Sequence, residues 1–186
     1  MRGALVGIAI VVAACGTYRR ELDPTESVRG ERRRVVQIPF ETLWPTILHV
    51  LPDEGIDVAR ADAEHGAITT RTIRFTGSDV PHRLAEVADL SRAHDAGFGR
   101  ASEMEITYYL LVAPAGDGGS LLRVRSAIEA VERSPILLGP GLLDIVPHRL
   151  EVPSRGVVEQ DLVRRIATNV YTAEEMLLML GELGLD

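Results

Sequence analysis

Residues 104–128 read MEITYYLLVAPAGDGGSLLRVRSAI, and this stretch decides the fold. Every second residue from Met104 to Val112 is apolar, and the turn-forming residues 114–120 separate this half from a second one. The second half repeats the alternation at Leu122, Val124 and Ile128. Such alternation is typical of an antiparallel sheet with one packed face and one wet face. The stretch therefore predicts a β-hairpin, with Arg123 and Arg125 on its solvent face.

A second hairpin is predicted upstream of the first. Residues 56–61 and 67–75 are rich in apolar and β-branched residues, and they flank the polar turn at residues 62–66. Gly66 supplies the backbone freedom that such a turn needs. His65 lies in the same turn, where the sequence places no second ligand beside it, so we interpret it as a solvated side chain.

Helices are predicted on either side of the hairpins. Residues 40–51 carry apolar residues at spacings of three and four, which places them on one helical face. These residues are Phe40, Leu43, Trp44, Ile47, Leu48 and Leu51. We expect Thr42 to cap this helix, Pro45 to lie in its first turn and Trp44 to anchor the core.

The carboxy-terminal region predicts two further helices. Val158, Leu162, Ile166 and Val170 recur every four residues. A capping box at residues 172–175 predicts the start of a separate last helix, in which Met176 and Met179 are read as core residues rather than cofactor ligands. The order of strand, helix, two hairpins and helix predicts an α+β fold, an antiparallel sheet packed on one face by helices, over residues 35–186.

Two segments do not fit this pattern. Residues 78–102 predict a few helical turns between Pro81 and Ala93 and otherwise a loop. Residues 135–147, PILLGPGLLDIVP, mix aliphatic residues with Gly and Pro, which argues against both a helix and an internal strand. We expect an apolar loop that either folds over the core or presents aliphatic side chains to a partner or to lipid. Those side chains are Leu137, Leu138, Leu142 and Leu143.

The amino terminus has the character of an export signal. An apolar run of eleven residues from Ala4 to Ala14 is too short to cross a bilayer, which takes about 20 residues. The run ends in Val12-Ala13-Ala14-Cys15, which resembles the bacterial lipobox. This resemblance implies removal of residues 1–14, acylation of Cys15 and attachment to membrane lipid. Cys15 is the single cysteine of the chain, so it has no internal disulfide partner.

A tether is expected between Cys15 and the folded domain. Residues 16–34 hold few aliphatic side chains and many charges, so they cannot form a core. Gly16, instead of Asp, follows the cysteine, and by resemblance to well-studied envelopes this points to the periplasmic face of the outer membrane. The arginines at 32–34 either contact anionic head groups or simply solvate the linker, and we favour the solvated linker.

A second resemblance concerns the folded domain. Residues 40–70, FETLWPTILHVLPDEGIDVARADAEHGAITT, resemble the unit found in lipoproteins of the BamC type, accessory components of the machine that inserts outer-membrane β-barrels. The matching positions are Trp44, Gly55, Ile56, Val58, Asp62, Gly66 and Ile68. The resemblance implies a helix-grip type of domain, a long helix held by a curved sheet, that is used for binding and scaffolding. It transfers no site residues.

Composition and motifs argue against several classes of function. The formal net charge of −7 argues against a general nucleic-acid binder. The chain has no nucleophile elbow, no His-x-x-x-His pair and no phosphate-binding loop, and we interpret the pairs Glu103/Glu105 and Glu174/Glu175 as solvated charge. We therefore expect a non-enzymatic binding or scaffolding module without cofactor or metal, acting on an envelope protein. The alternative is a periplasmic carrier of lipid or another apolar ligand.

Overall fold

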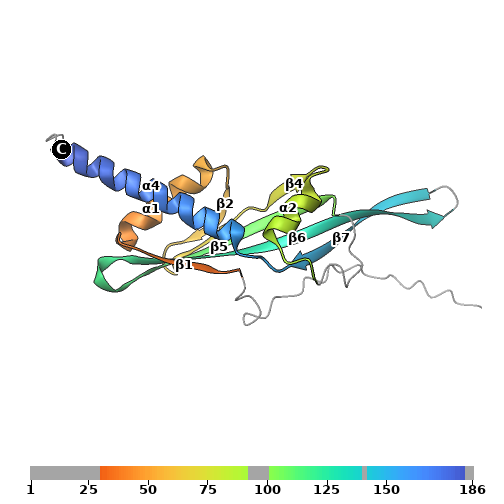
Figure 1. Cartoon of the computed structure of the whole chain (residues 1–186), viewed down its shortest axis with the longest axis horizontal. Coiled ribbons are helices and arrows are strands. Elements are labelled where there is room, and N and C mark those ends of the chain that lie inside the picture. The colour runs from red at the N-terminus through yellow and green to blue at the C-terminus, as the bar shows by residue number, and fades with distance from the viewer. Residues whose placement is uncertain (1–29, 92–100, 140–141, 183–186) are drawn as a thin grey trace, which may run out of the picture.

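The computed structural model describes residues 30–91, 101–139 and 142–182, and within these ranges the side chains of residues 117, 136–144 and 172–182 are not described. Its centre is a sheet of seven antiparallel strands (Figure 1). The strands are β1 (Arg32–Val36), β2 (Val58–Asp62), β3 (Ala67–Thr70), β4 (Ile73–Thr76), β5 (Glu103–Pro114), β6 (Ser120–Gly139) and β7 (Leu142–Val152).

The sheet is organised around its longest strand, β6, which has 20 residues. One side of β6 pairs with β5 over its first part, while the other side pairs first with β1 and then with β7. Strand β5 pairs in turn with β4 and β3, and β2 completes the sheet beyond β3. The hairpin of β5 and β6 is confirmed, and β2 pairs with β3 as predicted. The predicted second strand at residues 67–75 is divided, however, into β3 and β4, and β4 pairs with β5.

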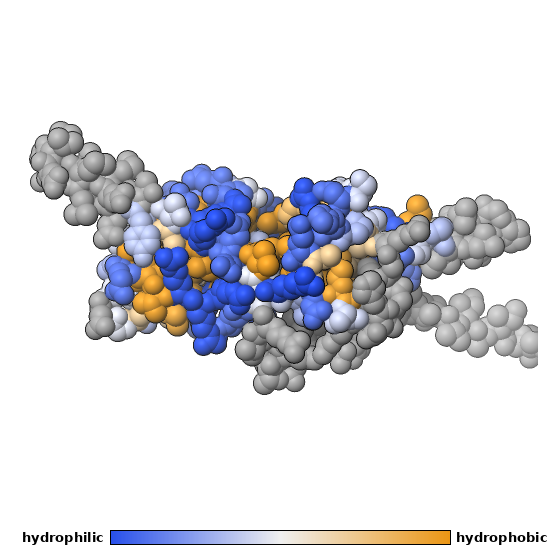
Figure 2. Space-filling model, viewed as in Figure 1, coloured by the Kyte–Doolittle hydropathy of each residue, from blue (hydrophilic) through white to orange (hydrophobic). Residues whose placement is uncertain are grey.

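Three helices lie on one face of the sheet (Figure 1). They are α1 (Phe40–Asp53), α2 (Val80–Val87) and α4 (Val157–Glu182), and a short 3-10 turn η2 (Gly116–Gly118) connects β5 to β6. The long helix α4 runs across β6 and β1. The predicted α+β class, with helices on one face of an antiparallel sheet, is confirmed. In the view of Figure 1, the helical side of the molecule is largely hydrophilic, with small hydrophobic patches between the helices (Figure 2).

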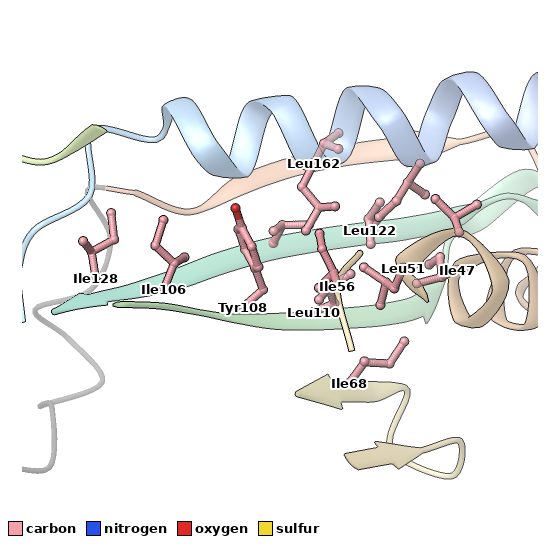
Figure 3. Packing of buried hydrophobic residues seen from close by; sticks show 14 of the residues in the cluster. Ile47, Leu51, Ile56, Ile68, Ile106, Tyr108, Leu110, Leu122, Ile128 and Leu162 are labelled. Carbon is pink, nitrogen blue, oxygen red and sulfur yellow. The ribbon is translucent and has the colours of Figure 1, made fainter. Parts of the chain in front are cut away.

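The core fills the layer between helices and sheet (Figure 3). Helix α1 contributes Leu43, Ile47 and Leu51, all of them fully buried. Leu162 and Ile166 of α4 are buried as well, and Figure 3 shows Leu162 above apolar side chains of β5 and β6. Burying each such side chain stabilises the fold by about 1.5–3 kcal/mol.

Alternation assigns the two faces of the sheet. Even-numbered residues of β5 from Met104 to Val112 are buried under the helices, as predicted. Odd-numbered residues such as Thr107, Tyr109 and Leu111 point to the opposite face. None of the described helices packs on that second face, which we call the open face.

The helix ends differ from the predictions. Helix α1 begins at Phe40, so Thr42 lies inside it and does not cap it. The carbonyl of Pro39 takes the place of a side-chain cap, since it accepts hydrogen bonds from the Thr42 and Leu43 amides at 3.1 and 2.9 Å. Pro45 consequently falls in the second turn of the helix. Trp44 packs against the core only partly buried, and its ring stacks on Phe40 with 5.6 Å between centroids.

Helix α4 is continuous from Val157 to Glu182. The prediction of a separate last helix starting at Thr172 was therefore wrong. Ala173, Glu174 and Glu175 of the predicted capping box also have good helical propensity, so they continue a helix that is already formed.

Two predicted segments also differ from the structure. The sheet begins at Arg32, so the last residues assigned to the tether form an edge strand, a place that charged side chains suit. Residues 135–147 were predicted as a loop, but most of them belong to β6 and β7 and pair with each other. The segment therefore extends the sheet instead of folding over the core. In the region of residues 78–102, α2 supplies the predicted helical turns, and residues 92–100 lie outside the described part.

Candidate interaction site on the open sheet face

A network of six charged side chains crosses four strands of the open face. Its members share one property, which is that each pairs with an opposite charge from a neighbouring strand. They are Arg74 of β4, Glu103 and Glu105 of β5, Glu129 and Arg133 of β6, and Arg149 of β7. The strand register brings these charges together, because residues opposite each other on antiparallel strands share a face. Arg74, for example, lies opposite Glu105.

Glu105 is the centre of this network. Only 5% of the residue is exposed, and its carboxylate accepts hydrogen bonds from Arg74 Nε at 2.9 Å and from Arg149 Nη2 at 3.3 Å. Arg149 Nη1 also bonds Glu105, and it reaches Glu129 at 3.0 Å. One carboxylate thus joins strands β4, β5 and β7.

Glu103 is buried at the edge of the same network, with 7% of the residue exposed. Its Oε1 accepts a hydrogen bond from Arg133 Nε. Its Oε2 lies 3.7 Å from Arg74 Nε but has no hydrogen bond from any residue that the structure describes. The expectation that Glu103 and Glu105 are solvated was therefore wrong, because arginines from three other strands fold over them.

The electrostatics of the network favour fixed charge. Burial alone would raise the pKa of Glu105, but hydrogen bonds and positive charge from Arg149 and Arg74 outweigh it and lower the pKa below its ordinary value. The hydrogen bond from Arg133 lowers the pKa of Glu103 in the same direction. Both carboxylates stay ionised at neutral pH, whereas general acid catalysis needs a carboxyl with a raised pKa.

Next to the network, the open face is hollowed over β3, β5 and β6. The hollow has a volume of about 280 Å³ and is open to solvent. Tyr109 and Leu111 contribute to its lining, and the Arg125 guanidinium lies 5.5 Å from the centroid of the Tyr109 ring. Glu31, at the entrance to β1, pairs with Arg123 at 2.9 Å on the rim.

A buried acid lies under the start of α4, on the other face of the sheet. Glu159 is fully buried, and its Oε1 accepts hydrogen bonds from the Ser126 hydroxyl at 2.6 Å and the Ser126 amide at 3.2 Å. Its Oε2 accepts a bond from the Ser154 hydroxyl at 2.8 Å. Burial, with the negative charge of Glu159 nearby, raises the pKa of Tyr108 to about 12. Sequence analysis missed Glu159, since its partner in β6 is 33 residues away.

Only some of the predicted site residues lie in the part of the chain that the structure describes. Cys15 lies outside the described residues, as do the side chains of Glu174 and Glu175. His65 is exposed in its turn, as predicted, with Nδ1 3.1 Å from the Asp62 carboxylate. The four leucines of the predicted apolar loop belong to strands β6 and β7 of the hairpin. The structure does not describe their side chains.

The described residues form neither a metal site nor a membrane-spanning helix. No group of three or more His, Cys, Asp or Glu residues within them is placed to hold a metal ion. Among the helices that the structure describes, none combines the length and the apolar character needed to cross a bilayer.

Comparison with known proteins leaves the chain without a family assignment. No protein-family model matches the sequence, and no curated protein is significantly similar to it.

Proposed function

We propose that this protein is an envelope lipoprotein, anchored through acylated Cys15 to the periplasmic face of the outer membrane, whose domain is a non-enzymatic binding or scaffolding module. The sequence Val12-Ala13-Ala14-Cys15-Gly16 supports the anchoring and the location. The resemblance of residues 40–70 to BamC-type lipoproteins supports a role in outer-membrane protein assembly.

The filled interior of the domain favours a binding module over a lipid carrier. A carrier needs an apolar cavity that encloses its ligand. Here the layer between α4 and the sheet is occupied by tightly buried side chains such as Leu122, Val124 and Leu162. One hollow on the open face and another beside Phe40 and His65 both open to solvent. Binding at the surface is therefore the better-supported mode.

The open face offers a suitable surface for a protein partner. Arginine and tyrosine are enriched at protein interfaces, because their flat polar ends bond while their long stems pack. Arg123, Arg125 and Tyr109 line the hollow. The neighbouring network of Glu103 and Glu105 holds its arginines in place, which reduces the entropy lost on binding.

The proposal is tested by crosslinking in native envelopes. A photo-crosslinking residue in place of Leu111 on the open face is compared with one in place of Arg164 on the exposed side of α4. We expect envelope proteins, with barrel-assembly components among them, to be captured from position 111 and not from position 164. Capture from position 164 alone would refute the assignment of the binding face.

The same sample tests the anchor. Mass spectrometry of the amino-terminal peptide is expected to show acylated Cys15 and no residues 1–14. A peptide that retains Met1, or an unmodified Cys15, would refute the lipoprotein proposal independently of the crosslinks.

A further inference from the structure

Two rows of side chains cross the hollow of the open face from strand to strand. The first row runs across β2, β3, β5 and β6 and consists of Arg60, Thr69, Tyr109 and Arg125. The second row continues onto β1 and consists of Asp62, Ala67, Leu111, Arg123 and Arg33. Residues opposite each other on antiparallel strands share a face, so both rows lie on the open face.

The middle of the two rows is uncharged, while both of its sides are cationic. Ala67 and Thr69 have short side chains and line the hollow together with two larger residues of β5. Arg60 lies on one side of them, with 79% of its side chain exposed, and Arg123 and Arg125 lie on the other side. The backbones of Arg60 and Arg125 are about 14 Å apart, which is three strand spacings. The hollow therefore has room for an apolar side chain between positive charges.

Glu31 shows which chemical group these arginines hold. Arg123 donates from Nε and Nη2 to the two carboxylate oxygens of Glu31, at 3.0 and 3.1 Å. Arg33 donates to the same carboxylate. Two parallel hydrogen bonds from one guanidinium match the geometry of a carboxylate. Glu31 lies just before β1, at the rim, and the hollow beside it stays open to solvent.

The surroundings of the hollow are more positive than the protein as a whole. The two rows together with Glu31 hold four arginines and two acids. The formal net charge of the chain, by contrast, is −7. Complementary charge across an interface speeds encounter and suppresses wrong partners. Local charge thus favours an anionic partner at this position of an otherwise acidic protein.

We propose that the hollow binds an acidic segment of a partner protein, which places an apolar side chain over Tyr109 and Leu111 and carboxylates beside Arg60 and Arg125. This inference rests on the proposed binding function and names the chemistry of its partner. Glu31 competes with the partner for the arginines of the rim. An anionic lipid surface also attracts arginines, but its head groups offer no apolar side chain that fills the hollow.

The test measures peptide binding to the acylated mature protein in nonionic detergent, by fluorescence polarisation. The probe is a labelled Glu-Gly-Leu-Gly-Glu peptide, whose acids are about 13 Å apart when the peptide is extended. Two matched peptides carry Gln or Lys in place of both Glu residues. We expect the acidic peptide to bind roughly tenfold or more tightly than the Gln peptide, and the Lys peptide to bind least. If the acidic peptide binds no better than the other two, the inference is wrong.

Two sets of substitutions should change the binding of the acidic peptide in opposite directions. Arg123→Gln/Arg125→Gln removes two cations and should weaken it roughly tenfold or more. Glu31→Gln removes the competing carboxylate and should strengthen it about threefold, as expected for loss of a surface ion pair. The matched control is Arg164→Gln on the exposed side of α4, which should leave the binding unchanged. A purely structural role of the rim would weaken binding in both cases, so weaker binding by Glu31→Gln would overturn the inference.

Crosslinking from position 111 in envelopes separates this inference from the proposed function. Capture that persists in Arg123→Gln/Arg125→Gln would leave the binding module standing and overturn the acidic partner. Absence of capture from position 111 would refute the proposed function, while the order of the three peptides would still decide the chemistry of the hollow. A third result would assign the face to lipid and overturn the inference: the unacylated Cys15→Ser chain binds phosphatidylglycerol vesicles through the two arginines and shows no preference for the acidic peptide.

Discussion

The Glu159 carboxylate, in the first turn of α4, accepts a 2.6 Å hydrogen bond from the Ser126 hydroxyl in the middle of β6. The same side chain binds Ser154, just before the helix. One fully buried acid therefore fixes the start of the longest helix to the longest strand. Its negative charge also lies at the positive end of the α4 dipole, where it is favoured.

We expect Glu159→Gln to destabilise the protein by about 1–3 kcal/mol, because an amide has one acceptor oxygen for groups that donate to two. Chemical denaturation measures the effect. The matched control is Glu86→Gln on α2, where the side chain is 60% exposed and the change should stay within about 0.5 kcal/mol. Equal effects at the two positions would show that Glu159 does not fix the helix.

Removal of one arginine from the charge network should also destabilise the sheet. Arg149→Met keeps the length of the side chain but leaves Glu105 and Glu129 short of a donor, at an expected cost of about 1–3 kcal/mol. Arg164→Met removes an ion pair with Asp161 at a side chain that is 74% exposed, and it should cost at most about 0.5 kcal/mol. If urea unfolding curves of both variants coincide, the network contributes no more than a surface pair.

Stability should fall in acid because of the same carboxylates. The pKa values of Glu103 and Glu105 are lowered from 4.5 in the folded protein, so the unfolded chain binds protons at a higher pH than the folded one. The stabilisation is therefore present above about pH 4.5 and is lost as the pH falls through the lowered pKa values. Unfolding midpoints measured from neutral pH into acid should show this loss. The variant Glu103→Gln/Glu105→Gln should show a shallower slope, and an unchanged slope would contradict the assignment.

Gly66 should be the more sensitive of two turn glycines. A Cβ at Gly66 would lie 1.9 Å from the Val112 carbonyl oxygen, and the backbone φ is +62°. Gly55 has a similar φ of +73° but open space around it. Gly55→Ala should cost about 1–2 kcal/mol for the backbone conformation alone. Gly66→Ala should cost about 3 kcal/mol or more, because β5 must also move. Similar thermal unfolding of both variants would disprove the close approach.

The faces of the elements could be predicted from the sequence because periodicity encodes them. The alternation from Met104 to Val112 gave the buried face of β5, and Leu162, Ile166 and Val170 of the predicted helix are buried in α4. An apolar side chain is favoured on a buried face whatever its particular neighbours are, so this signal is local.

The β6–β7 hairpin and the charge network could not be predicted in the same way. Pro135 and Pro147 argue against an internal strand, but past Val131 both β6 and β7 are edge strands, where proline is tolerated. The burial of Glu103 and Glu105 depends on arginines at least 30 residues away in the sequence. Local patterns carry no information about such partners.

The pairing of β1 along β6 also determines how the domain responds to tension. A pull on the residues before Gly30, directed along the strand, loads all five β1–β6 register pairs at once, from Arg32 with Val124 to Val36 with Ser120. Hydrogen bonds sheared together resist far better than bonds opened one after another. The contact of the Arg32 guanidinium with the Arg155 carbonyl and with Gly156 adds a side-chain clamp at the point where the load enters. With the lipid anchor proposed above, the domain can thus be drawn away from its membrane and still keep its sheet intact.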